Sequence, residues 1–126
     1  MKLGVVNQLL EVEMIISYKN KSKRLDKLVV DTGAAHTLIS TDIVEDLGIF
    51  FENGDPLVSS YGIGGVEYSF RKPVDLIKFG THEIKEMKLD FGNLHEWGIN
   101  GLIGLDILLD GQFIIDLKDL VMVQSE

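Results

Sequence analysis

The stretch Leu28-Val29-Val30-Asp31-Thr32-Gly33-Ala34 decides the fold, because three apolar residues lead into an acidic residue and a turn of small residues. The apolar run predicts a buried strand over residues 25–30, and Gly33 allows backbone groups to approach closely just after it. A carboxylate at the end of a buried strand is costly unless it is paired or hydrogen-bonded. Asp31 is therefore either a turn aspartate that binds its own loop, which is common, or a functional carboxylate.

Short β-type runs lie on both sides of this stretch. Residues 10–18 alternate imperfectly between apolar and polar, and the polar residues 19–23 form a turn, so a hairpin with residues 25–30 is expected. Residues 37–39 predict a third strand. A helix over residues 42–47 follows, because Ser40 or Thr41 can cap it and Gly48 can end it.

The rest of the chain continues the β pattern. Further strands are expected over residues 57–61, 66–70, 74–79, 84–91, 112–116 and 120–123, and a second short helix over residues 105–109. The fold class is therefore mainly β, with one or two short helices. The length of 126 residues predicts a single domain over residues 1–126.

Composition restricts the partners and the chemistry. The net charge of −8 argues against nucleic acid or an anionic membrane, because phosphate binding needs clustered Lys and Arg. The one basic cluster, residues 19–24, is interpreted as a solvated hairpin turn. The absence of cysteine excludes disulfides and a cysteine nucleophile. No apolar run approaches the roughly 20 residues of a membrane span, so a soluble cytoplasmic protein is expected.

A second motif follows about 70 residues downstream, Gly101-Leu102-Ile103-Gly104-Leu105-Asp106-Ile107-Leu108. Between the two motifs lies a glycine-rich hairpin tip, Tyr61-Gly62-Ile63-Gly64-Gly65. In order and spacing the sequence resembles the retropepsin-like aspartic proteases over roughly residues 11–123. The second motif and the closing run Ile114-Ile115-Asp116-Leu117 look most like the DNA-damage-inducible cellular branch of that family.

The resemblance implies a closed acid-protease barrel that functions as a homodimer. Asp31 would be catalytic, with a second Asp31 supplied by the partner copy, and Thr32 would hydrogen-bond across the two-fold axis. Two such carboxylates would share a proton and activate a water for hydrolysis of a peptide or protein substrate. The loop would be supported by Thr32, Gly33, Ala34, Leu102, Ile103 and Gly104.

Two further segments would contact the substrate by resemblance. The hairpin tip would form a flap over the peptide, although an ordinary glycine turn explains the same pattern. Trp97 and Ile99 could line subsites, although a lone tryptophan is more often a core or dimer contact. The flap residues are Tyr61, Gly62, Ile63, Gly64 and Gly65.

Other functions fit less well. The histidines are scattered without ligand spacing, so neither a metal nor a cofactor is expected. A phosphate-binding loop of the sugar-kinase type would need two large domains. The open alternative is a catalytically silent peptide-binding or dimerisation module of the same fold, against which the intact Asp31-Thr32-Gly33 weighs. Leu105-Asp106 stands where viral members use an arginine in dimer contacts, and Asp106 is assigned a structural role at the helix start.

Overall fold

A computed structural model describes residues 1–62, 65–94 and 97–124 as a mainly β protein, as the sequence predicts. The strands are β1 (Gly4–Val6), β2 (Leu9–Tyr18), β3 (Lys21–Val30), β4 (Leu38–Ser40), β5 (Leu57–Gly62), β6 (Gly65–Phe79), β7 (His82–Gly92), β8 (Gly101–Ile103), β9 (Phe113–Asp116) and β10 (Val121–Gln124). The helical elements are the 3₁₀ turns η1 (Thr41–Ile43) and η2 (Glu45–Leu47) and the helix α1 (Leu105–Asp110).

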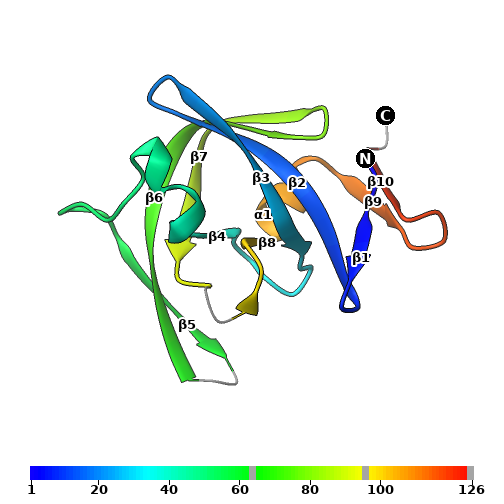
Figure 1. Cartoon of the computed structure of the whole chain (residues 1–126), viewed down its shortest axis with the longest axis horizontal. Coiled ribbons are helices and arrows are strands. Elements are labelled where there is room, and N and C mark those ends of the chain that lie inside the picture. The colour runs from blue at the N-terminus through cyan, green and yellow to red at the C-terminus, as the bar shows by residue number, and fades with distance from the viewer. Residues whose placement is uncertain (63–64, 95–96, 125–126) are drawn as a thin grey trace.

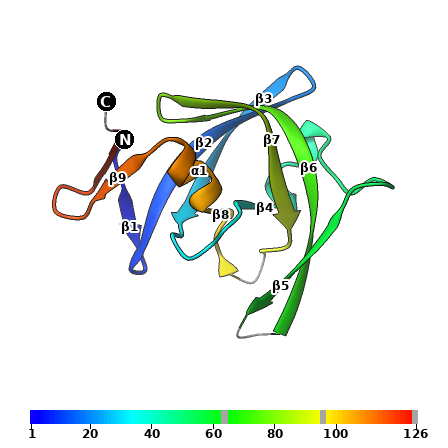
Figure 2. The same ribbon diagram turned by 180° about the vertical axis from the view of Figure 1, so that it is seen from behind.

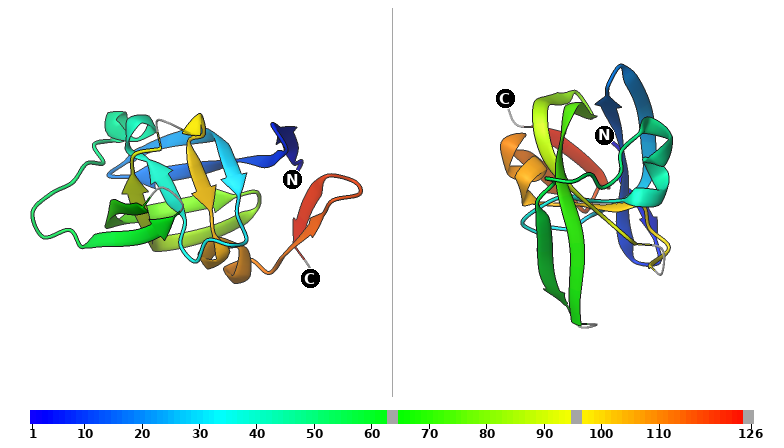
Figure 3. Two further views of the ribbon diagram at one scale, coloured as in Figure 1. Left: turned by 90° about the horizontal axis from the view of Figure 1, so that it is seen from below. Right: turned by 90° about the vertical axis from the view of Figure 1, so that its left-hand side faces the viewer.

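Eight strands form one curved sheet in the order β1-β2-β3-β8-β4-β7-β6-β5, and β2 also pairs with β6 (Figure 1). Most neighbours are antiparallel, but β3 pairs in parallel with β8 and β4 with β7. β9 and β10 form a separate antiparallel pair beside the N-terminus (Figure 1). Seen from behind, α1 lies beside β8 (Figure 2). The β5–β6 hairpin projects beyond the rest of the molecule (Figure 3).

The β2–β3 hairpin turns more tightly than the sequence predicts. Lys19 and Asn20 form a two-residue turn with φ values of 47° and 68°, so β3 begins at Lys21 rather than near residue 25. Two positive φ values match the right-handed twist of the flanking strands. The N–H of Lys19 also donates to Asp75 Oδ2 at 2.7 Å, which fastens the turn to β6.

The helix predicted over residues 42–47 is wrong. The segment forms two separate 3₁₀ turns around Val44, and no side chain of Ser40 caps the first of them. Val44, Leu47 and Ile49 are all buried, so this short segment winds tightly to place its apolar side chains in the core. Gly48 ends it with φ of 83°, as expected of a glycine stop.

β6 is one continuous strand of 15 residues, although the sequence predicts two strands separated near Pro73. Pro73 is tolerated because of its position in the sheet. β5 pairs with β6 up to Phe70, and β2 pairs with it from Leu76, so Pro73 lies where β6 has β7 as its one partner. A proline that cannot donate a hydrogen bond fits at such an edge.

The core lies inside the curved sheet and is closed at one end by α1. The largest fully buried side chains come from elements far apart in sequence, including Met14, Phe79, Phe91 and Ile103 of the strands and Ile107 of α1. The terminal segments belong to the same structure, because Leu3 is buried and its N–H donates to the Leu120 carbonyl. Among the described residues, no helix is long and apolar enough to cross a membrane.

Candidate active site

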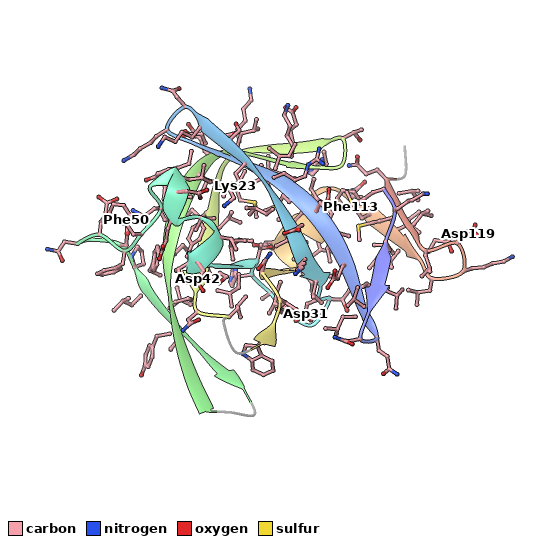
Figure 4. All side chains as sticks on the ribbon, in the orientation of Figure 1. Lys23, Asp31, Asp42, Phe50, Phe113 and Asp119 are labelled. Atoms are coloured by element: carbon pink, nitrogen blue, oxygen red, sulfur yellow. The ribbon has the colours of Figure 1, made fainter. Side chains whose placement is uncertain are left out.

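Asp31 lies directly after β3, where the chain leaves the core. Leu28 and Val29 are buried, whereas Asp31 is partly exposed at the lower end of β3 (Figure 4). The N–H of Asp31 donates to the Ile103 carbonyl at 2.9 Å, which continues the parallel pairing of β3 with β8. The sheet therefore fixes the backbone of Asp31 and leaves its carboxylate near the surface.

The turn after Asp31 folds back on its carboxylate. The N–H of Gly33 donates to Asp31 Oδ1 at 2.9 Å, and the N–H of Ala34 donates to the Asp31 carbonyl at 3.1 Å. A Cβ atom on Gly33 would lie 3.3 Å from Asp31 Oδ1, so this glycine permits the close approach that the sequence suggests. Asp31 thus binds its own loop and remains partly exposed at the same time.

The second motif lies behind the Asp31 loop (residues 31–37), as the sequence predicts. Ile103 is fully buried and accepts the Asp31 N–H, while Leu105 N–H donates to the Ala34 carbonyl at 2.8 Å. A Cβ atom on Gly104 would lie 2.8 Å from that carbonyl oxygen. Gly104 is therefore required for the close packing of the two segments. Leu102 pairs with Val29 and is partly buried.

Thr37 and Asp106 form a connection that the sequence does not reveal. Thr37 is fully buried, and its hydroxyl donates to Asp106 Oδ1 at 2.6 Å while accepting from the Gly104 N–H at 3.0 Å. The Thr37 N–H donates to Asp106 Oδ2 at 2.8 Å. Asp106 is structural, as expected, but its main role is to fix the end of the Asp31 loop. A threonine before an apolar pair looks like any strand residue, so no local pattern marks it.

Asn100 fixes the strand that carries Asp31. Its N–H donates to the Lys27 carbonyl at 2.9 Å, and its side-chain amide donates to the Asp26 carbonyl at 2.9 Å. Its own carbonyl accepts the Ser40 N–H at 2.9 Å. Lys27 has φ of 53°, and the pairing of β2 with β3 shifts register there. Asn100 therefore holds a β-bulge in place just before the Asp31 loop.

The remaining predicted site residues lie elsewhere on the surface. Tyr61 and Gly62 end β5 and Gly65 begins β6, whereas Ile63 and Gly64 lie outside the described residues. Trp97 is 64% exposed, so it is not a core residue, and its prediction as a subsite or dimer contact stays a prediction. Ile99 is partly buried, and Thr32 is exposed. Of the predicted site residues, the structure thus brings together those of the Asp31 loop and those of the Leu102-Ile103-Gly104 motif.

The described residues include no group of three or more His, Asp or Glu side chains that could hold a metal ion. His36 is exposed within the Asp31 loop. The His82 ring contacts Asp110 Oδ2 at 2.7 Å, far along the chain from Asp31, and Gln124 contacts the other ring nitrogen. His95 lies outside the described residues.

A family model described as aspartyl protease matches residues 16–107, well over half of the chain. The chain belongs to the aspartyl protease family. The matched region contains both the Asp31 loop and the Leu102-Ile103-Gly104 motif. No curated protein matches the chain by sequence.

Solved structures of retropepsin-like proteases share the fold. A retropepsin-like aspartic protease from Rickettsia conorii has a TM-score of 0.69 at 19% identity, covering 98% of this chain and 97% of that one. The retroviral protease-like domain of Ddi1 from Leishmania major has a TM-score of 0.64 at 18% identity, covering 94% and 89%. EIAV protease complexed with the inhibitor HBY-793 has a TM-score of 0.62 at 22% identity, covering 83% and 89%.

Proposed function

We propose that the protein is an aspartic endopeptidase whose two catalytic carboxylates are Asp31 of two identical chains. The observation that carries this proposal is the Asp31 loop itself: a partly exposed carboxylate on a loop held from behind by buried backbone hydrogen bonds. The chain contains one Asp-Thr-Gly, so the second carboxylate must come from a second copy. Membership of the aspartyl protease family supports the same assignment.

The chemistry follows from two carboxylates that face each other. They cannot both ionise easily, so the pair shares one proton and titrates as a unit, for which aspartic proteases are the familiar example. The ionised carboxylate takes a proton from a water molecule as that water attacks the peptide carbonyl carbon. The protonated carboxylate hydrogen-bonds the carbonyl oxygen, and a proton then passes to the leaving nitrogen.

The surface around Asp31 supports a homodimer. Thr32 and Gly33 are exposed in the single chain, where they could meet the same residues of a partner. In Figure 4, Asp31 lies between the β5–β6 hairpin at the bottom and the β9–β10 pair at the right. Large apolar side chains are exposed at the end formed by the terminal strands, namely Val5, Val6, Leu9, Ile114, Leu117, Leu120 and Val123.

The peptide would lie between the Asp31 loop and the β5–β6 hairpin. The hairpin projects downward from the body, on the side to which the Asp31 end of β3 points (Figure 4), so it would act as the flap that closes over the substrate and excludes water. Exposed Trp97 lies shortly before β8, which supports the Asp31 loop, so Trp97 and Ile99 would contact substrate side chains or the partner copy.

The decisive test is Asp31→Asn. The amide is nearly isosteric but cannot act as a base, and both sites of each dimer change at once, so peptide cleavage should fall by several orders of magnitude. The fold should survive, because removal of two close carboxylates relieves their repulsion. Asp75→Asn is the matched control: Asp75 is exposed and accepts the Lys19 N–H, a role that an amide oxygen can keep. Cleavage of a diverse peptide library is measured from about pH 3 to about pH 8.

Thr32→Ala tests the dimer separately. Loss of the hydroxyl should weaken the dimer, so specific activity should fall at low protein concentration and recover at high concentration. Sedimentation and activity are measured over the same concentrations. The silent-module alternative is favoured if the wild-type protein is dimeric, cleaves no peptide of the library, and binds some of them as tightly as Asp31→Asn does.

A further inference from the structure

An ion pair joins β6 to β7 at the base of the β5–β6 hairpin. Arg71 and Asp90 stand directly opposite each other, and Arg71 Nε lies 2.7 Å from Asp90 Oδ1 and Nη2 3.2 Å from Oδ2. The Asp90 side chain is only 8% exposed and that of Arg71 is 29% exposed. These bonds raise the pKa of Arg71. A partly buried, bidentate ion pair of this kind fixes the orientation of the two side chains as well as the distance between them.

Arg71 stands where the hairpin leaves the body of the protein. The ladder between β5 and β6 ends with Leu57 opposite Phe70, and the next residue, Arg71, donates its N–H to the Pro56 carbonyl at 2.9 Å. The ladder between β6 and β7 runs from Ser69 to Phe79, so beyond Phe70 β7 continues beside β6 after β5 has ended. The backbone of Arg71 therefore closes the hairpin, and its side chain fastens that point to Asp90.

Asp90 also holds the end of the Asp31 loop. The Asp90 N–H donates to the Thr37 carbonyl at 3.1 Å, and Leu38 pairs with Asp90 in the parallel ladder of β4 and β7. Thr37 is the residue whose hydroxyl bridges Asp106 and the Gly104 N–H. A single residue thus binds the hairpin through its carboxylate and the loop through its backbone.

We propose that Arg71 and Asp90 are positioning residues that set the separation between the β5–β6 hairpin and the Asp31 loop, and with it the height of the peptide channel. This inference rests on the proposed protease function. Neither side chain needs to touch the substrate, because Arg71 acts on the β5–β6 hairpin and Asp90 acts on the Asp31 loop. The neighbouring Lys72 contrasts with Arg71: its partners Glu52 and Asp55 lie in the segment before β5, not on the strand that holds the loop.

Kinetics separates a positioning role from a merely structural one. If the pair only stabilised the fold, its loss would lower the fraction of active enzyme, so the apparent kcat would fall at unchanged KM. If the pair sets the channel, its loss weakens peptide binding in the ground state and the transition state alike, so KM rises and kcat changes little. Arg71→Met removes the charge and keeps a long apolar stem. We expect KM to rise about tenfold, with kcat within about twofold.

Lys23→Met is the matched control. Lys23 is another cation bound to a carboxylate, Asp46 at 2.9 Å, and its side chain is 35% exposed, close to the 29% of Arg71. Its partners lie on η2 and at the Ile43 carbonyl, away from Asp90. We expect Lys23→Met to keep the wild-type KM. Arg71→Lys should recover part of the loss, because one charged hydrogen bond can re-form.

A double-mutant cycle tests whether the two residues act through each other. Asp90→Asn keeps the backbone bond to Thr37 and removes the charge, so it should raise KM about as much as Arg71→Met does. The double variant should be no worse than either single variant, because both remove the same interaction. Additive effects on KM, or a lower kcat at unchanged KM in variants shown to be folded, would overturn the proposal.

Hydrogen exchange tests the same link without relying on activity. In Arg71→Met, amides of residues 31–40 should exchange at least about fivefold faster than in the wild type, whereas Lys23→Met should leave them unchanged. If the wild type cleaves no peptide, the protease function fails, and exchange alone then decides the link. If residues 31–40 exchange equally fast in Arg71→Met and Lys23→Met, the ion pair does not hold the Asp31 loop, whether or not the protein is a protease.

Discussion

The Asp31 loop and the β5–β6 hairpin would face each other across the substrate, yet they are held in different ways. The loop is fixed by uncharged donors: Asp31 N–H to Ile103, Leu105 N–H to Ala34, and the Gly104 N–H to the Thr37 hydroxyl. The hairpin has its own ladder and is closed by the bond from the Arg71 N–H to the Pro56 carbonyl, but the side-chain contacts at its base include the ion pairs of Arg71 and Lys72.

This difference separates two physical requirements of a protease. A catalytic carboxylate must stay within a fraction of an ångström of its working position, which buried backbone hydrogen bonds and close packing provide. A hairpin that admits a peptide must open, so its fixed point is best confined to its base. The loop should therefore respond mainly to changes of shape and the hairpin base to changes of charge, and the Arg71–Asp90 pair is the point at which a change of charge reaches the loop.

Gly104→Ala should have the largest effect on the loop. The new Cβ atom would lie 2.8 Å from the Ala34 oxygen and 2.8 Å from the His36 carbonyl carbon, both of them backbone atoms that cannot turn aside. We expect a loss of about 3 kcal/mol in the free energy of unfolding, measured by urea denaturation.

Gly4→Ala is the control for Gly104→Ala. A Cβ atom on Gly4 would meet its nearest neighbours at 3.8 and 3.9 Å, which is ordinary contact. This variant should change stability by less than about 0.5 kcal/mol. Wild-type stability of Gly104→Ala would show that the two motifs do not pack as closely as the distances indicate.

Thr37→Val should have the next largest effect. Valine has nearly the shape of threonine but no hydroxyl, so the buried Gly104 N–H loses its acceptor and Asp106 Oδ1 loses its 2.6 Å donor. We expect a loss of about 2 kcal/mol, most of it from the unsatisfied N–H. Thr81→Val is the control, because Thr81 is exposed and its hydroxyl bond to Gln124 is 3.2 Å long. Equal losses in the two variants would contradict a special role for Thr37.

The same contrast explains what the sequence could predict. The Asp31 loop and its supporting motif are contiguous runs of apolar and small residues that can be found in the sequence, and the resemblance to retropepsin-like proteases implied that the two pack together. Thr37 and Asn100 act through partners far away in the chain. Asp106 lies 69 residues from Thr37, and Asp26 lies 74 residues from Asn100. No local pattern encodes such pairs. The helix at residues 42–47 failed for a related reason, since burial of Val44 and Ile49 overrode local propensity.

The smallest expected effect is a pH dependence at the hairpin base. The Glu52 N–H and then the Lys72 ammonium hold the pKa of Asp55 below its ordinary value of 3.8. Burial alone would lower the pKa of Lys72, but its bonds to Glu52 and Asp55 raise it above 10.5. A lowered carboxyl pKa contributes stability that is present above the ordinary value and lost as the pH falls through the folded one. A raised lysine pKa contributes stability that is lost only as the pH rises beyond its ordinary value.

The hairpin base should therefore loosen on the acid side, below about pH 4, while the Asp31 loop keeps its protection. We expect the hydrogen-exchange protection of residues 50–58 to fall by about threefold between pH 5 and pH 3, after correction for intrinsic rates, with residues 31–40 unchanged. Asp55→Asn should remove most of this dependence, because the amide oxygen can still accept the Glu52 N–H but carries no charge to lose. Parallel loss of protection in both segments would mean that acid acts on the whole fold. The contrast between a loop held mainly by backbone donors and a hairpin base held by ion pairs would then be wrong.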